Sequence, residues 1–350
     1  MSRTVLAPVV ALALACGVLL GASGPAGATT PTPAPSATAP ESARDLASFG
    51  IAPSGPSKPD QRPFVSMVVS PGTVAYDHVA LLNQAGAPIE LRVYGSDVVM
   101  ADGGGLSARP EADASSDAGS WIAVDGASAV TVPAQTDRGF GYTVVPFSIS
   151  VPTNAEPGDH VGGLVASLVS VGEGGGDTPG IELDQRVVAR IYVQVKGDLA
   201  PGLEVVEVGT VWRPGLLGAG PGRVTVEYTI RNTGNTRMAV EPAVAVEGPF
   251  GLARRSVVDK RVDELLPGGE VRRSTTVGGV VPLVFERVTV TARGVAPASG
   301  VDPHLDPVSH GVRMWAVPWS VLALLLLVVA GLVARGVVRK VARKAPAESR

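Results

Sequence analysis

Apolar and polar residues alternate along many short stretches of this chain. The clearest stretch is residues 181–195, where Ile, Leu, Val and Ala take most odd positions and charged or amide side chains take most even ones. A period of two is typical of a β-strand that buries one face. Similar segments fill residues 48–197, separated by Gly, Pro, Asn and Asp and without a capped helical period. This pattern predicts a first antiparallel β-sandwich over residues 48–197.

A second set of alternating segments follows over residues 202–296. The stretch "YTIRNTGNTR" at 228–237 repeats the order of "VALLNQAGAP" at 79–88, in which a strand, an Asn, a turn Gly and another strand follow one another. Asn and Gly tolerate the backbone angles of tight turns. We therefore predict an all-β fold of two tandem immunoglobulin-like β-sandwiches, with one C-terminal transmembrane helix described below.

The segment "PFSISVPTNAEPGDHVGGLVASL" at 146–168 interrupts its own alternation. Pro152, Pro157 and Gly158 prevent a continuous strand, which predicts a tight corner between two strands. Gly162 and Gly163 follow the corner and leave room for the close approach of another backbone, either a neighbouring strand or a glycan. We favour the strand.

The two ends of the chain carry targeting patterns. Arg3, an apolar run and "AGA" at 26–28 predict a secretory signal peptide over residues 1–28, followed by a disordered Pro/Thr/Ala-rich leader at 29–47. Cys16 lies in the signal peptide, and Ala13 is too small for a lipoprotein site, so we expect a mature chain without cysteine, disulfide or thiol chemistry.

An uncharged apolar run near the C-terminus predicts a transmembrane helix over residues 315–334. A helix of this length crosses roughly 30 Å. A Pro-rich juxtamembrane stalk at 297–314 precedes it, and a basic cytoplasmic tail at 335–350 follows it. The positive-inside rule then places residues 48–314 outside the cell membrane. The residues predicted at the membrane interface are Trp315, Trp319, Arg335, Arg339 and Lys340.

Charge differs between these regions. The sequence contains 29 Lys and Arg residues, of which one lies in the signal peptide and six follow the helix, and 32 Asp and Glu residues, of which one lies in the tail. The exterior region therefore holds 22 basic and 31 acidic residues, a net charge of about −9. This charge disfavours nucleic acid and anionic wall polymers as broad electrostatic partners.

Candidate catalytic residues are few. The histidines show no zinc-ligand spacing, no "GxSxG" elbow is present, and the glycine-rich stretches 101–106 and 172–180 precede strands rather than helices. We therefore predict no metal, no cofactor and no enzymatic activity. Asp159 and His160 are adjacent and could assist a hydrolase, although neighbouring strand residues point to opposite sides. Trp121 could stack on a sugar, but we favour a buried position.

Several blocks of the first predicted sandwich are similar to the WxL-interacting protein family of Gram-positive cell surfaces. They are "FGIAPSGP" at 49–56, "SPGTVAYDHVALLNQAGAPIELRVYGSDV" at 70–98, "DAGSWIAV" at 117–124 and the corner segment at 146–168. The resemblance implies a membrane-anchored surface protein whose first domain binds peptidoglycan and whose second domain engages a partner surface, with secreted WxL proteins as companions. The high Ala, Gly and Val content is typical of a high-GC actinobacterium.

The leading hypothesis is thus a single-pass, non-catalytic surface protein that binds peptidoglycan or another wall component, together with an exported surface protein. The sequence leaves Trp121, Asp159 and His160 as candidate ligand-binding residues. One alternative is a scaffold or assembly subunit for surface appendages that adds a partner's strand to an open sheet edge. A second alternative is an extracellular hydrolase.

Overall fold

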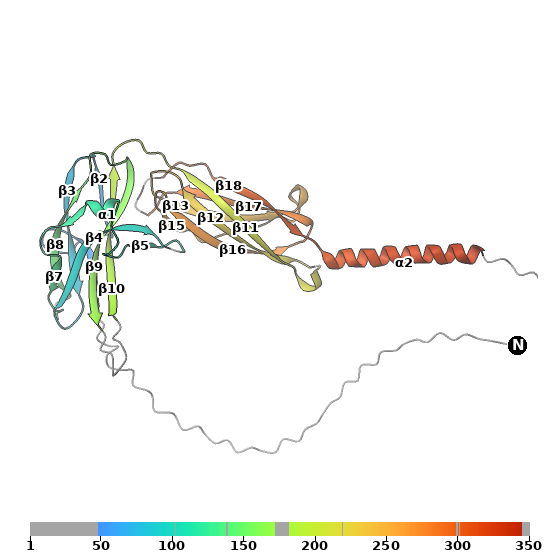
Figure 1. The fold of residues 1–350 in the computed structure, drawn as a ribbon, viewed down its shortest axis with the longest axis horizontal. Helices are drawn as coiled ribbons and strands as arrows, with labels where there is room; N and C mark the ends of the chain where they lie inside the picture. The colour runs from blue at the N-terminus through green and yellow to red at the C-terminus, as the bar shows by residue number, and fades with distance from the viewer. Residues whose placement is uncertain are drawn as a thin grey trace, which may run out of the picture. The chain divides into compact units, whose positions relative to one another are not determined.

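The computed structural model describes residues 48–344, apart from residues 102, 138, 172–181, 219, 299 and 301. The predicted signal peptide and leader, and the glycine-rich stretch 172–180, lie outside the described residues. The described chain is all-β except for short helical turns and one long C-terminal helix (Figure 1). It forms two tandem immunoglobulin-like sandwiches, as the alternating patterns predict.

The first sandwich packs two sheets face to face. One sheet has the strand order β1-β3-β8-β6, and the other has the order β2-β10-β9-β4-β5, with β7 also paired to β4. All pairs are antiparallel except β2 with β10, which run parallel. The elements are β1 (Phe49–Ser54), β2 (Val65–Val69), β3 (Val74–Asn83), β4 (Ile89–Met100), β5 (Leu106–Ala108), α1 (Ala118–Trp121), β6 (Ile122–Val124), β7 (Ala129–Val132), β8 (Gly141–Ser150), β9 (Gly158–Val171) and β10 (Glu182–Val195).

The second sandwich pairs β11-β12-β16 in one sheet and β14-β13-β17-β18 in the other, with β15 added to β13. Its elements are β11 (Leu203–Arg213), η2 (Leu216–Gly218), β12 (Gly222–Asn232), β13 (Met238–Glu247), η3 (Pro249–Gly251), β14 (Arg255–Val258), β15 (Val262–Leu265), β16 (Glu270–Val280), β17 (Val284–Val295) and β18 (Val308–Ala316). The helix α2 (Trp319–Lys344) follows.

Each sandwich has its own apolar core between its two sheets. Phe147, Leu81 and Ile191 are fully buried in the first, and Tyr228 and Met238 are buried in the second. Burying each such side chain contributes roughly 1.5–3 kcal/mol. In β10, Ala189, Ile191, Val193 and Val195 are buried, so this strand faces the core as its period of two predicts.

The repeated Asn motif forms the same structure in both sandwiches. Asn83 and Asn232 are completely buried at the ends of β3 and β12. The side-chain oxygen of each accepts a hydrogen bond from the backbone N–H two residues later, and Nδ2 donates to the carbonyl four residues later, at 2.8 Å in both cases. Nδ2 of Asn83 also donates to the carbonyl oxygens of Val132 and Pro133 at the end of β7, and Nδ2 of Asn232 donates to that of Leu265 in β15. The buried Asn therefore closes the turn and ties it to a neighbouring segment.

The predicted corner transfers the chain from one sheet to the other. β8 ends at Ser150 in the first sheet, and β9 begins at Gly158 in the second, with a φ of 130° at Gly158 that favours glycine. Beyond the corner, a Cβ at Gly163 would lie 2.5 Å from a methyl group of Val188 on the paired strand. At Gly162 the close backbone belongs to α1, since a Cβ there would lie 3.0 Å from the Gly119 nitrogen.

The predicted stalk at 297–314 is wrong in its second half. β18 pairs with β17 from Val308 to Ala316, so the second sandwich extends well beyond residue 296. The physical reason is that Met314 and Ala316 are buried in the core, with Val308 and Val312 packed against it. Pro and His residues nearby obscured this alternation in the sequence.

The predicted start of the helix is wrong as well. Trp315 belongs to β18, is exposed, and packs its ring edge-to-face on Phe285 at 6.5 Å. α2 begins at Trp319, directly after Pro318, which has no N–H to extend the strand pairing. Arg335, Arg339 and Lys340, predicted in the tail, continue the helix. Residues Trp319–Lys340 are long and apolar enough to cross a membrane.

Candidate functional site

The three candidate residues fall into two separate groups. Trp121 ends α1 with 9% of its surface exposed, and its ring lies against the His160 ring with centroids 4.7 Å apart. Asp159, next to His160 in β9, points away from both and contacts Arg237 of the second sandwich. The alternation of side chains along a strand explains this division.

Both ring nitrogens of His160 are occupied. Nδ1 lies 2.6 Å from the Asp117 carboxylate, and Nε2 lies 2.9 Å from the carbonyl oxygen of Glu156. Burial lowers the pKa of His160, but the hydrogen bonds to Asp117 and Glu156 and the charges of Asp117 and Asp159 together raise that pKa above its ordinary value. The arrangement fixes α1 to the corner and leaves neither nitrogen directed at a substrate.

A buried carboxylate that the sequence analysis missed positions α1. Asp97, near the end of β4, is 4% exposed and accepts hydrogen bonds from the backbone N–H groups of Ser116, Asp117 and Gly119 at 2.7, 3.2 and 2.8 Å. Carboxylates that accept several backbone N–H groups are strongly held. Asp97 therefore sets the position of both Trp121 and Asp117.

Polar side chains also connect the two sandwiches. The Arg237 guanidinium lies 3.8 Å from the centre of the Tyr192 ring and 3.2 Å from Glu264, and its backbone N–H donates to Asp159 at 2.9 Å. The Tyr192 hydroxyl donates to Glu264 at 2.8 Å. Burial and the nearby Glu264 charge raise the pKa of Tyr192, so the hydroxyl stays a donor. The Arg237 side chain is 7% exposed, so the network is largely shielded from water.

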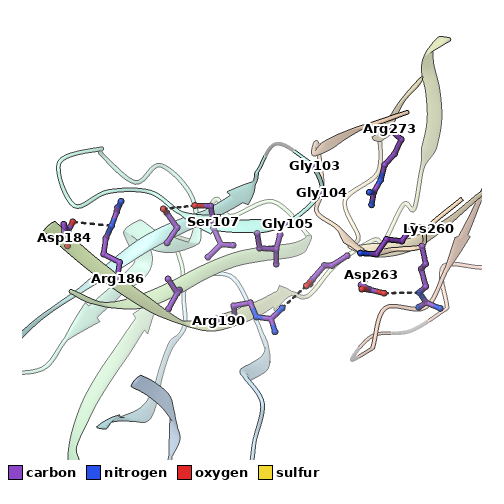
Figure 2. Close-up of a pocket in the computed structure, with 16 residues that line it drawn as sticks. Gly103, Gly104, Gly105, Ser107, Asp184, Arg186, Arg190, Lys260, Asp263 and Arg273 are labelled. Atoms are coloured by element: carbon purple, nitrogen blue, oxygen red, sulfur yellow. Dashed lines mark hydrogen bonds and ion pairs between the residues drawn. The ribbon is translucent and has the colours of Figure 1, made fainter. Parts of the chain in front are cut away.

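A large cleft lies beside this network, with a volume of about 870 Å³ (Figure 2). Its floor is the outer face of β10, one side is the β4–β5 hairpin with its glycine tip, and the other side is formed by β15, β16 and the segment before β15. Five basic and three acidic side chains line it. They are Arg186, Arg190, Lys260, Arg261 and Arg273, with Asp184, Asp263 and Glu264.

The cleft is therefore locally basic although residues 29–314 as a whole carry a net negative charge. Each acid has a basic neighbour. Asp184 lies 3.3 Å from Arg186, Glu264 lies 3.4 Å from Arg190, and Asp263 lies 3.6 Å from Arg261. Among the residues that line the cleft, this pairing leaves Lys260 and Arg273 without a direct ion pair, and the charge of Arg273 interacts with the nearby Asp259 carboxylate.

One edge of β10 is open over part of the strand, on the side away from β9 and the β4–β5 hairpin. β9 pairs with β10 over its full length, but β2 pairs only with its last five residues, Ile191–Val195. Among the strands that the structure describes, none pairs with this edge between Asp184 and Arg190. An unpaired strand edge presents N–H and C=O groups in the spacing that another strand needs. Arg186 and Arg190 project from this stretch into the cleft (Figure 2).

Within the described residues, no group of three or more His, Cys, Asp or Glu side chains is arranged to hold a metal ion. The chemistry that these features offer is hydrogen bonding by an open strand edge and electrostatic attraction by unpaired basic groups.

Comparison with known proteins gives no family. No protein-family model and no curated protein matches the chain. Solved structures match with low similarity. A chain of a chaperone–tip adhesin complex from CFA/I fimbriae biogenesis is 10% identical, with a TM-score of 0.35, and covers 75% of this chain and 98% of its own length. The class 5 fimbriae chaperone CfaA is 12% identical, with a TM-score of 0.35 and coverage of 77% and 100%. The Pseudomonas aeruginosa CupB2 chaperone is 11% identical, with a TM-score of 0.29 and coverage of 73% and 99%. Similarity at this level establishes neither a shared family nor a shared function.

Proposed function

We propose that this chain is a non-catalytic, membrane-anchored surface protein that binds an extended segment of another exported protein along the open edge of β10. The observation that carries the proposal is the unpaired stretch from Asp184 to Arg190 beside a basic cleft. A partner strand added there would continue the line of β2 and satisfy backbone groups that the chain itself leaves open.

The side chains of this stretch supply specificity. Along the edge, Arg186 and Arg190 point into the cleft, and Val187 and Ala189 point toward the core side of the sheet. An incoming strand would place alternate side chains on the same two faces. Charges on an edge strand disfavour unselective pairing, so the proposed partner segment carries complementary acidic residues on one face.

The membrane anchor supports a surface location. α2 is long and apolar enough to span a bilayer, and Arg335, Arg339 and Lys340 lie near its C-terminal end. Basic residues at that end favour a cytoplasmic C-terminus, which would place both sandwiches outside. The cleft would then meet exported proteins.

Peptidoglycan binding is the second candidate function. It follows from the resemblance to WxL-interacting proteins, and exposed aromatic side chains on the first sandwich favour it. Tyr76 and Tyr142 are 71% and 43% exposed on the outer face of the β1-β3-β8-β6 sheet, and Phe140 next to β8 is 56% exposed. Aromatic rings combine a flat apolar face with a polar edge, which suits sugar rings.

Site-directed cross-linking on intact cells tests the first proposal. Since the only cysteine lies in the predicted signal peptide, Leu183→Cys would introduce a single thiol at the start of the β10 edge, for attachment of a photo-cross-linker. The matched control is Val258→Cys, an equally simple change at an exposed position of β14. We expect a discrete protein adduct from position 183 and none from position 258.

Equal adducts from both positions, or none from either, would refute strand capture. Co-sedimentation of the full chain with purified sacculi, lost on Tyr76→Ala and Tyr142→Ala, would instead support peptidoglycan binding. The two assays therefore separate the two candidate functions.

A further inference from the structure

The second-sandwich wall of the cleft holds two basic side chains, Lys260 and Arg273, that form no direct ion pair. Arg273, on β16, is half-buried, and its Nε is fully buried with no hydrogen-bond acceptor. Lys260, on the segment before β15, faces the same cleft. Over the residues that the structure describes, neither side chain forms an ion pair, whereas Arg186, Arg190 and Arg261 each do. The Asp259 carboxylate is near enough to interact electrostatically with Arg273, although the two do not form a direct ion pair. Because the Nε atom has no accessible surface, a group bound in the cleft would meet the other atoms of the Arg273 side chain, which line the cleft.

The glycine tip of the β4–β5 hairpin lies directly against Arg273 (Figure 2). Gly103 and Gly104 have φ values of 88° and 89°, which favour glycine. A Cβ at Gly104 would lie 2.8 Å from Val271 and 3.4 Å from the Arg273 guanidinium. Glycine at this position therefore lets the hairpin tip approach β16 and the guanidinium closely.

We propose that Arg273 and Lys260, beside this glycine tip, form a binding site for an oxyanion, either a carboxylate or a phosphate. The planar guanidinium can hold two oxygens of such a group at once, and the flexible ammonium of Lys260 adds a second charge. The inference deepens the proposed function, because it assigns an acidic group to the captured segment. It depends on that function only for the source of the anion, since binding of a free anion can be measured separately.

Neighbouring arginines provide a matched test. Arg273→Gln and Lys260→Gln remove the proposed ligands, and Arg272→Gln changes the next residue of β16, whose side chain is exposed and lies 3.5 Å from Glu207 outside the cleft. Each full-length variant is purified in a non-ionic detergent. Binding of radiolabelled inorganic phosphate is then measured by equilibrium dialysis at constant ionic strength, with acetate as competitor.

We expect saturable binding to the wild type, at least about tenfold weaker binding to Arg273→Gln and Lys260→Gln, and an affinity within about twofold of wild type for Arg272→Gln. Arg273→Gln should melt at or above the wild-type temperature without phosphate, which excludes misfolding as the cause. Unchanged phosphate affinity in Arg273→Gln, or no binding at millimolar phosphate, would overturn the inference.

Competition identifies the source of the anion. Displacement of phosphate by a Glu-rich peptide but not by glycerol phosphate assigns the site to acidic protein segments, and the reverse assigns it to a phosphorylated polymer. Arg273-dependent phosphate binding without an adduct at position 183 would retain the oxyanion site and refute strand capture. An adduct at position 183 without phosphate binding would support strand capture and refute the oxyanion site.

Discussion

Replacing Asp97 with Asn should destabilise the first sandwich strongly although the two side chains have nearly the same size. The carboxylate is 4% exposed, and three backbone N–H groups of the segment 116–119 donate to its two oxygens. The Asn amide keeps one acceptor oxygen but has an NH2 group in place of the second oxygen. This group is itself a donor, so at least one of the buried backbone N–H groups loses its acceptor.

The size of the effect follows from these contacts. Hydrogen bonds to a charged group contribute about 1.5–3 kcal/mol each, and an orphaned buried donor costs a similar amount. Loss of one or two bonds therefore predicts a decrease of about 3–5 kcal/mol in the free energy of unfolding. With a urea m-value of about 2 kcal/mol/M, the midpoint should fall by roughly 1.5–2.5 M.

The assay is urea unfolding of the full-length chain in a non-ionic detergent, followed by tryptophan fluorescence, since Trp121 is nearly buried on the α1 turn that Asp97 holds. Asp113→Asn is the control, because Asp113 is an exposed residue of the same loop. Midpoints for the two variants that agree within about 0.2 M would show that the Asp97 contacts do not stabilise the fold as argued.

Three further predictions concern the corner and the second sandwich. Asn232→Ala removes two donated and one accepted hydrogen bond and should cost about 2–3 kcal/mol in urea unfolding; a cost below about 0.5 kcal/mol would contradict its role. The raised pKa of His160 means that its pairing with Asp117 stabilises the fold at low pH and is lost as pH rises through the folded-state value. The melting temperature of wild type should therefore fall, relative to that of His160→Gln, as pH rises above about 6.5, and parallel profiles would refute this. Gly158→Ala combines a positive φ with a clash against the Asn235 carbonyl, so faster proteolysis of the segment 196–202 is expected, and an unchanged rate would argue against it.

Local patterns in the sequence predicted the elements that depend on local physics. The alternation in β10 predicted its buried face, and the repeated Asn and Gly of the stretches 79–88 and 228–237 predicted two equivalent turns. The Pro and Gly residues of the corner predicted the break between β8 and β9. Each of these rests on a period of two or on the backbone preferences of a few residues. Trp121 was correctly expected to be buried, because an exposed tryptophan would leave a large apolar surface in contact with water.

The cleft could not be predicted in the same way, because its parts come from distant segments. Arg190 and Glu264 are 74 residues apart, and the glycine tip meets Arg273 only through the fold. The net negative charge of residues 29–314 also concealed a local excess of basic groups along the cleft. A similar limit applies to β18, since its inward residues contact strands far earlier in the chain.

Only Val317 and Pro318 separate the last strand from α2, and this short connection has a mechanical consequence. The chain enters the second sandwich at Leu203, which pairs with the last residue of β12. The pairings of β13 with β17 and of β17 with β18 then place Leu203 at the end of the sandwich opposite Ala316. Under the proposed function, a pull between the captured partner and the membrane would therefore run along the strands and shear the whole β17–β18 ladder at once, instead of separating it pair by pair. Such a geometry would resist mechanical unfolding of the second sandwich while the anchor is under tension.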